Sequence, residues 1–229
     1  MPLHSIQRLS ATAVLGLWHL TETPEELWEL LPQPTAYKPL LPVAATVQRQ
    51  AQWLGGRVLI HRLAAEILAL PPPDLVVRND ATGRPWLAGS VDSLAVSLSH
   101  SGTWVAAVLA QHGRVGVDIE IVRDKAQRLA SKFLAPKEWA AAQAATQTNP
   151  EMATAHYSLL WSAKETLYKL AGQRGIIFKN QLLLGSFVFQ AAGEIPGALI
   201  INNLHTRHRI CYSEPAPGYV LTYCYEPIR

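Results

Sequence analysis

The stretch YSLLWSAKETLYK, residues Tyr157–Lys169, decides how the second half of the chain folds. An apolar residue returns every three or four positions, at Leu160, Ala163, Leu167 and Ala171. This spacing places the four side chains along one face of an α-helix. The stretch is therefore predicted to form an amphipathic helix, which Gly172 closes.

The opposite face of this predicted helix carries polar chemistry. Trp161, Glu165 and Lys169 are four residues apart, so they stack along one side. Upstream, the predicted strand VGVDIEI at 115–121 alternates apolar and non-apolar positions, which places Asp118 and Glu120 on one sheet face. If that face meets the helix, three carboxylates and a lysine converge, as a site for a divalent cation and a phosphate requires.

Each half of this pattern also has an ordinary structural interpretation. Glu165 and Lys169 alone would form a surface ion pair that stabilises a helix by about 0.2–0.5 kcal/mol. Asp118 and Glu120 alone would form a solvated strand face. Neighbouring carboxylates on one face repel each other, however, unless solvent or a cation relieves the repulsion.

Apolar periodicity and turn residues place the remaining elements. In the first half we predict a strand at 11–20, a helix at 23–31 capped by Thr23, and a long helix at 43–70. The pair Gly55-Gly56 in the long helix indicates either very close packing or a kink. A strand at 75–78 follows, and then an antiparallel meander of three strands within 94–121.

The second half is predicted to begin with helices and to end with strands. Residues 130–145 read as helical with a break at Pro136, and Asn149 is the expected N-cap of the helix that contains Glu165. Four strands are expected after it, at 186–190, 198–203, 208–213 and 219–226. This order indicates an α+β fold with antiparallel sheets rather than a regular βαβ repeat.

Composition limits the classes of function. The chain has 229 residues, 49% of them hydrophobic, with a net charge of +3 and a pI of about 8.9. Lys and Arg form no run, so we expect no nucleic-acid partner. Cys211 and Cys224 fit free thiols of a reducing compartment. Without a signal-type segment or an apolar run of about eighteen residues, a cytoplasmic protein with no membrane span is expected.

Several residues of the first half are candidates for anion binding. The run Ser99-His100-Ser101 lacks the frame of a nucleophile elbow and fits anion contact better than a catalytic triad. Arg84, between Gly83 and Pro85, is suited to bidentate phosphate contact but also to an ordinary surface role. The same two interpretations hold for Arg49 and Arg57, which share one stripe of the long predicted helix.

The order of five motifs resembles one family. They are GRP at 83–85, SLSHSG at 97–102, VGVDIE at 115–120, KFLAPKEW at 132–139 and WSAKETLYK at 161–169. The chain thereby resembles the 4′-phosphopantetheinyl transferase superfamily in its larger, single-chain Sfp-type branch. The resemblance implies a pseudo-twofold α+β monomer of two similar halves, 1–113 and 114–229, with coenzyme A bound at an active site between them.

The resemblance also implies a reaction and its residues. Members transfer the 4′-phosphopantetheine arm of coenzyme A to a serine of an acidic acyl or peptidyl carrier protein and release adenosine 3′,5′-bisphosphate. Glu165, or a metal-bound water, would take the serine proton, and Lys169 would act on the transferred phosphate. The implied Mg²⁺ ligands are Asp118, Glu120 and Glu165. The implied coenzyme A contacts are Arg84, Ser99, His100, Arg49 and Arg57.

One position departs from the usual pattern, and two other functions stay open. Thr166 follows Lys164-Glu165 where the common branches have serine or alanine, which leaves the ligands untouched. A non-catalytic protein that binds coenzyme A or a carrier is one alternative, disfavoured by the retained carboxylates and Lys169. Another Mg²⁺-dependent phosphotransferase or a nucleotide hydrolase is the second, disfavoured by the lack of a P-loop.

Overall fold

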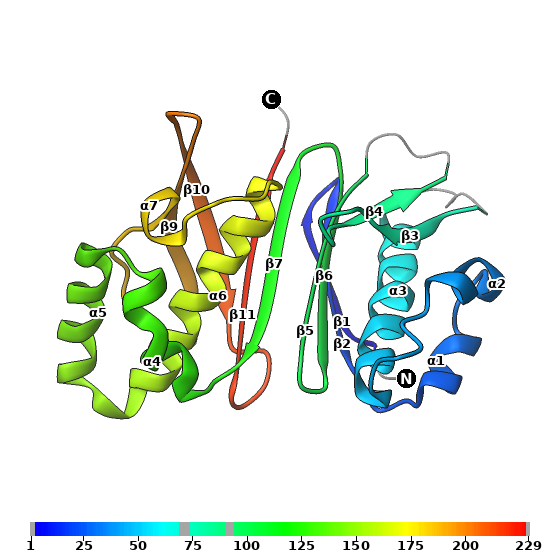
Figure 1. The fold of residues 1–229 in the computed structure, drawn as a ribbon, viewed down its shortest axis with the longest axis horizontal. Helices are drawn as coiled ribbons and strands as arrows, with labels where there is room; N and C mark the ends of the chain where they lie inside the picture. The colour runs from blue at the N-terminus through cyan, green and yellow to red at the C-terminus, as the bar shows by residue number, and fades with distance from the viewer. Residues whose placement is uncertain (1–2, 69–73, 90–93, 228–229) are drawn as a thin grey trace. The chain divides into compact units, whose positions relative to one another are not determined.

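The computed structural model describes residues 3–68, 74–89 and 94–227, and the chain divides into two compact units. Unit 1 comprises residues 1–115 with 227–229, and unit 2 comprises residues 116–226. The join expected near Gly113 lies in the turn between β6 (Trp104–Gln111) and β7 (Arg114–Ile121). Each unit is an antiparallel sheet packed with helices, so the predicted α+β class is confirmed (Figure 1).

Unit 1 is built on a four-stranded sheet in the order β1-β2-β6-β5, in which all neighbours are antiparallel. A separate hairpin pairs β3 with β4. The further strands of the unit are β1 (Leu3–Ser10), β2 (Ala13–His19), β3 (Val76–Asn79), β4 (Pro85–Ala88) and β5 (Leu94–Ser101). Its helical elements are α1 (Pro24–Glu29), α2 (Pro34–Tyr37), the 3₁₀ turn η1 (Lys38–Leu40) and α3 (Val47–Ile67).

The local signals of unit 1 are largely confirmed. Thr23 caps α1 through a reciprocal capping box with Glu26, as its sequence predicts. The long helix begins later than residue 43, because Thr46 is its N-cap, and its expected end at residue 70 lies outside the described residues. Strand β1 precedes the first strand that periodicity predicts. It is a half-exposed edge strand with little alternation, which explains why pattern alone does not reveal it.

The structure shows whether the pair Gly55-Gly56 of α3 reflects close packing or a kink. A Cβ atom added to Gly55 would lie 2.6 Å from Leu20, and one added to Gly56 would lie 2.7 Å from Leu98. Leu98 belongs to β5 of the sheet that α3 covers. Close packing of the helix against the sheet therefore explains both glycines.

Unit 2 contains a five-stranded sheet in the order β7-β11-β10-β9-β8. Its further strands are β8 (Leu182–Leu184), β9 (Ala192–Ile201), β10 (Leu204–Ser213) and β11 (Tyr219–Glu226). Its helical elements are α4 (Asp124–Phe133), α5 (Pro136–Thr148), the 3₁₀ turn η2 (Pro150–Met152), α6 (Ala153–Ala171) and α7 (Phe178–Gln181). Figure 1 shows α6 lying along this sheet, where Leu159, Ala163 and Leu167 enter the core.

Three expectations for these elements are wrong. Strand β7 does not complete a meander with β5 and β6, because it joins the sheet of unit 2 beside β11. Residues 186–190 form no strand, and the edge strand β8 at 182–184 takes that place. Asn149 does not cap α6, because η2 intervenes and Met152 occupies the N-cap position.

The end of α6 and the start of α5 agree with prediction. Gly172 terminates α6 in a left-handed conformation with φ of 67°. Pro136 begins α5, and the helix before it starts at residue 124 rather than 130. None of the helices in the described parts of the chain is long and apolar enough to cross a membrane.

Gly116 on β7 fixes how closely α6 approaches the sheet. A Cβ atom at this position would lie 2.2 Å from the carbonyl oxygen of Thr166, which is main chain and cannot move aside. We expect Gly116→Ala to lower the free energy of unfolding by about 1–3 kcal/mol, measured by urea denaturation. Gly56→Ala is the control, because its methyl meets the movable end of Leu98. An equal loss in both variants would contradict the close approach.

Candidate active site

Glu165 is the centre of the polar face that α6 turns toward β7. Burial, together with the charge of Asp118, raises the pKa of its carboxyl from 4.5 to about 7. Lys169 acts in the opposite direction, and the charge of Glu120 adds to the increase. The structure thus brings together the three carboxylates and the lysine that the two periodicities predict.

Asp118 occupies the buried end of this group. It is 3% exposed, and its Oδ1 accepts a hydrogen bond of 2.8 Å from the Nζ of Lys169. The same ammonium donates to the carbonyl oxygen of Val117 at 2.9 Å. The hydroxyl of Ser162 on α6 donates to the carbonyl oxygen of Asp118 at 3.4 Å. Lys169 is therefore held against the carboxylate, and its action on a phosphate stays a prediction.

Glu120 is oriented by the indole of Trp161. The Nε1–H of Trp161 donates to Oε1 of Glu120 at 3.3 Å. The indole stacks on Phe178 with ring centroids 5.7 Å apart and meets Phe133 edge-on at 5.1 Å. The structure thus gives Trp161 both packing contacts and a hydrogen bond that positions a candidate ligand.

The donor set suits a hard divalent cation. Carboxylate oxygens are the ligands that Mg²⁺ takes from proteins, and it leaves positions for substrate phosphates and water. Burial and the charge of Asp118 keep the pKa of Glu165 near 7, and a bound cation would offset both effects on the carboxylate. On these two grounds Asp118, Glu120 and Glu165 fit Mg²⁺.

Two predicted anion-binding residues meet in unit 1. Nη1 of Arg49, on α3, contacts both ring nitrogens of His100, on β5. Ser99 lies next to His100, is 9% exposed and stands opposite Ala106 of β6. A guanidinium and an imidazole so placed are suited to bind an anion.

The other two arginines of the prediction differ in their surroundings. Arg57 is 3% exposed, with its guanidinium 3.7 Å from the ring centroid of Trp53 and 2.5 Å from Oδ1 of Asn79. Burial and the nearby charge of Arg49 lower the pKa of Arg57 to about 10. Arg84 is half-buried in the β3–β4 turn, where its main-chain N–H donates to Asp80. Arg57 thus has a structural role, and phosphate binding by either arginine stays a prediction.

Sequence reasoning missed the role of Lys164. Its side chain is 0% exposed, and its Nζ lies 2.6 Å from Oε2 of Glu138 and also donates to the carbonyl oxygens of Phe178 and Leu182. Glu138 in turn accepts from the main-chain N–H of Leu184 at 2.5 Å. This ion pair ties α6 to the start of α5 and to β8. The apolar periodicity of the helix carries the one usable signal, since position 164 adjoins Ala163 on the buried side.

The charge of Glu165 gives stability a dependence on pH. The pKa of its carboxyl is about 7 in the folded chain against 4.5 ordinarily, so between these values the folded state binds more protons. Stability therefore falls as pH rises from 4.5 to above 7, by up to about 3 kcal/mol. Urea denaturation in EDTA should show this slope in the wild type and a smaller one in Glu165→Gln. Equal slopes would show that the pKa of Glu165 is not raised in the folded chain.

The hydrogen bond from Trp161 to Glu120 predicts a change in metal affinity. Trp161→Phe keeps an aromatic ring between Phe133 and Phe178 but removes the N–H. We expect the affinity for Mn²⁺, read as a spectroscopic substitute for Mg²⁺, to fall by about 10–100-fold. Circular dichroism should show an unchanged fold. Unchanged affinity would mean that the indole does not orient Glu120.

Comparisons with known proteins identify relatives of the second unit. Residues 114–224 match the family model described as the 4′-phosphopantetheinyl transferase superfamily. The chain is 34% identical over 126 residues to the 4′-phosphopantetheinyl transferase AcpT of Salmonella typhimurium, covering 54% of this chain and 60% of that protein. It is 31% identical over 118 residues to the 4′-phosphopantetheinyl transferase psf-1 of Bacillus pumilus, covering 52% and 48%.

A further relative shows the same coverage. The 4′-phosphopantetheinyl transferase of Bacillus subtilis is 30% identical over 118 residues, which are 52% of this chain and 50% of that protein. The chain thus matches about half to three fifths of the length of these curated relatives. The matched range 114–224 includes Asp118, Glu120, Glu165 and Lys169. Residues 114–224 of the chain are therefore similar to the 4′-phosphopantetheinyl transferase superfamily.

Proposed function

We propose that the protein transfers the 4′-phosphopantetheine arm of coenzyme A to a serine of an apo carrier protein, with Mg²⁺, and releases adenosine 3′,5′-bisphosphate. The partner is proposed to be an acidic acyl or peptidyl carrier protein, and the chain to act as a monomer. The similarity of residues 114–224 to the superfamily model, and of the chain to named 4′-phosphopantetheinyl transferases, supports the class of reaction. The residues of unit 2 support its chemistry.

One observation carries the proposal. Within unit 2, Glu165 of α6 is close enough to Asp118 and Glu120 of β7 for their charges to raise its pKa. Nearby acids repel each other, so such a cluster lowers stability, and its presence is typical of a functional site. Transfer of a phosphate-linked group would need it, because the reacting phosphates are anionic and require a cation beside them.

Asp118, Glu120 and Glu165 are the residues that would hold Mg²⁺. When bound, Mg²⁺ neutralises the charge of the pyrophosphate that would repel an incoming oxygen. Lys169, fixed in place by Asp118 and the carbonyl oxygen of Val117, is positioned to stabilise negative charge that develops on the transferred phosphate. Its ammonium would exchange part of this contact for the phosphate.

The proton and the leaving group complete the step. The serine oxygen of the carrier forms a bond to the β-phosphorus, which bears pantetheine. The bond from that phosphorus to the bridging oxygen breaks, and adenosine 3′,5′-bisphosphate leaves with the electron pair. Glu165, which lies beside Asp118 and Glu120, is the group proposed to accept the serine proton.

The cationic residues of unit 1 are proposed to bind the phosphates of coenzyme A. The contact between Arg49 and His100 supports this assignment, because it places a guanidinium with several N–H donors beside an imidazole. Ser99 and Arg84 are proposed to add a hydroxyl and a guanidinium. For Arg57, the contacts with Asn79 and Trp53 support a role in holding the neighbouring groups.

A mass-spectrometric assay tests the proposed function. The protein is incubated with coenzyme A, Mg²⁺ and several apo carrier proteins, and each carrier is weighed. We expect one carrier at least to gain the mass of phosphopantetheine, and the gain to be absent in EDTA. If coenzyme A binds but no carrier gains mass, the chain is a binding protein and the transfer proposal is wrong.

A further inference from the structure

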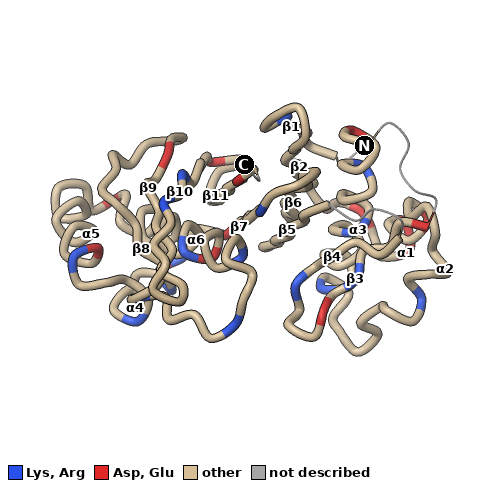
Figure 2. The backbone as a smooth tube through the Cα atoms, turned by 90° about the horizontal axis from the view of Figure 1, so that it is seen from above, with Lys and Arg blue, Asp and Glu red and all other residues tan. Residues whose placement is uncertain are grey.

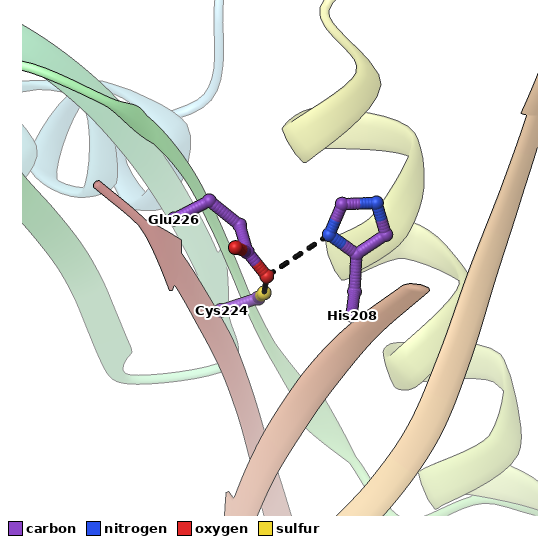
Figure 3. Close-up of side chains that lie close together, drawn as sticks. All are labelled: His208, Cys224 and Glu226. Atoms are coloured by element: carbon purple, nitrogen blue, oxygen red, sulfur yellow. Dashed lines mark hydrogen bonds and ion pairs between the residues drawn. The ribbon is translucent and has the colours of Figure 1, made fainter. Parts of the chain in front are cut away.

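Three side chains of different donor chemistry gather on β10 and β11, outside the residues proposed for transfer. His208 comes from β10, and Cys224 and Glu226 come from β11 (Figure 3). The Nδ1, Sγ and Oε atoms that they offer all lie within 4.8 Å of one another. The proposed reaction gives none of these residues a role.

The pairing of the two strands explains why the side chains meet. β10 and β11 are antiparallel, with Cys211 opposite Tyr223. The same register, continued toward the end of β11, sets His208 opposite Glu226. Cys224 and Glu226 are two residues apart, so both side chains point to one face of the sheet. The grouping therefore follows from the strand register and is not a chance meeting of mobile surface groups.

Two of the three side chains are buried, and the third is partly exposed to solvent. The His208 side chain is 2% exposed and Cys224 is 1% exposed, whereas the Glu226 side chain is 32% exposed. Cys224 belongs to the hydrophobic core of unit 2. An ion bound here would have its nitrogen and sulfur ligands in a dry environment and one coordination position toward solvent.

The distances match a tetrahedral ion with mixed ligands. Nδ1 of His208 lies 3.0 Å from Oε1 of Glu226, and Sγ of Cys224 lies 3.8 Å from the same oxygen. Tetrahedral zinc, with bonds of about 2.0–2.1 Å to nitrogen and oxygen and 2.3 Å to sulfur, places such ligand pairs about 3.3 Å and 3.6 Å apart. Shifts of a few tenths of an ångström would therefore bring these two pairs to tetrahedral spacing, and the third pair, Nδ1 and Sγ, lies within 4.8 Å.

Thr206 supplies the outer contact that a histidine ligand needs. Its Oγ1 lies 2.7 Å from Nε2 of His208. Histidine ligands almost always donate their second ring N–H to an oxygen, which fixes the ring and leaves the other nitrogen free to bind metal. A hydrogen bond from Nε2 to Thr206 would therefore leave the lone pair of Nδ1 for a metal. Figure 3 shows this nitrogen facing the carboxylate of Glu226.

We propose that His208 Nδ1, Cys224 Sγ and a carboxylate oxygen of Glu226 form a zinc site with one open position. The thiolate and imidazole donors favour Zn²⁺ over Mg²⁺, which prefers oxygen. Binding releases the thiol proton of Cys224 and replaces the direct contact between His208 and Glu226 by two bonds to the ion. Zinc at this position would clamp β10 to β11 at the end of unit 2.

Zinc titration of the full chain tests the proposal. The metal-free protein competes with a chromophoric chelator for Zn²⁺ in excess Mg²⁺, which occupies any site made of carboxylates alone. We expect one tight Zn²⁺ per chain. Thr206→Val should weaken binding by about 10–100-fold, and Cys224→Ser and His208→Gln should weaken it further. Cys211→Ser is the matched control, because it removes the other thiol from the neighbouring strand and should leave affinity unchanged.

Two results would overturn the proposal. One is the absence of tight one-to-one binding in the wild type, and the other is equal zinc affinity in Cys224→Ser and Cys211→Ser. If a substitution in the core unfolds the chain, Co²⁺ binding to the folded proteins provides a second test. Co²⁺ added to the folded wild type and to Cys211→Ser should produce a thiolate-to-metal charge-transfer band. A cobalt spectrum without that band contradicts the assignment of Cys224.

Discussion

Asp118→Asn should lower the rate of phosphopantetheine transfer by about 10²–10⁴-fold, because a metal at this position contributes several kcal/mol of transition-state stabilisation. The substitution keeps the size of the side chain and the oxygen that can accept from Lys169. It removes the charge that both the metal and the lysine need. The rate is measured as the mass gain of an apo carrier protein with time.

The effect on transfer must be separated from an effect on folding. Asp118 is buried and bound to Lys169, whose side chain is 25% exposed, so some loss of stability is expected. Glu165→Gln provides the matched variant, since it removes a carboxylate whose charge is repelled in the folded state. We expect it to lose transfer while its stability at neutral pH is unchanged or higher. Transfer at the wild-type rate in both variants would refute the metal assignment.

Lys164→Met should lower the free energy of unfolding by about 3–5 kcal/mol, the largest stability effect that we expect in this chain. The side chain of Lys164 is 0% exposed and that of Glu138 is 7% exposed, so methionine would leave a buried carboxylate without its cation. Burial lowers the pKa of Lys164, and the charge of Glu138 opposes this shift. Urea denaturation with an unchanged m-value measures the loss.

A double variant shows whether the charge or the packing is responsible. Glu138→Gln in the Lys164→Met background removes the stranded charge and leaves an oxygen that can accept from the N–H of Leu184. We expect the double variant to recover part of the stability that Lys164→Met loses. If Lys164→Met costs less than about 1 kcal/mol, the pair is not the tie between α5, α6 and β8 that its contacts indicate.

The sequence predicts α6 and the carboxylates well because their signals are local. Period 3.6 and period 2 set which residues share a face, and Gly116 confirms the contact because a side chain there would collide with α6. The charged residues on each face can therefore be identified from the sequence. This identification predicts that Glu165 lies near Asp118 and Glu120.

Long-range pairing could not be predicted in the same way. β7 pairs with β11, about a hundred residues later in the chain, and periodicity carries no information about which strands join. For the same reason, the sequence does not predict the contact between His208 and Glu226, which depends on the register of β10 and β11. The sequence does not reveal the role of Lys164, because a charged residue in a polar-looking run gives no sign that the side chain of its partner, Glu138, is buried.

The proposed function depends on one divalent cation bound by Asp118, Glu120 and Glu165. Mn²⁺ binding measured by electron paramagnetic resonance tests this claim most directly, because free and bound Mn²⁺ are distinguished in one sample. We predict one Mn²⁺ per chain, displaced by Mg²⁺, lost in Asp118→Asn and retained in Cys224→Ser. Binding of the same strength in Asp118→Asn and in the wild type would contradict the account.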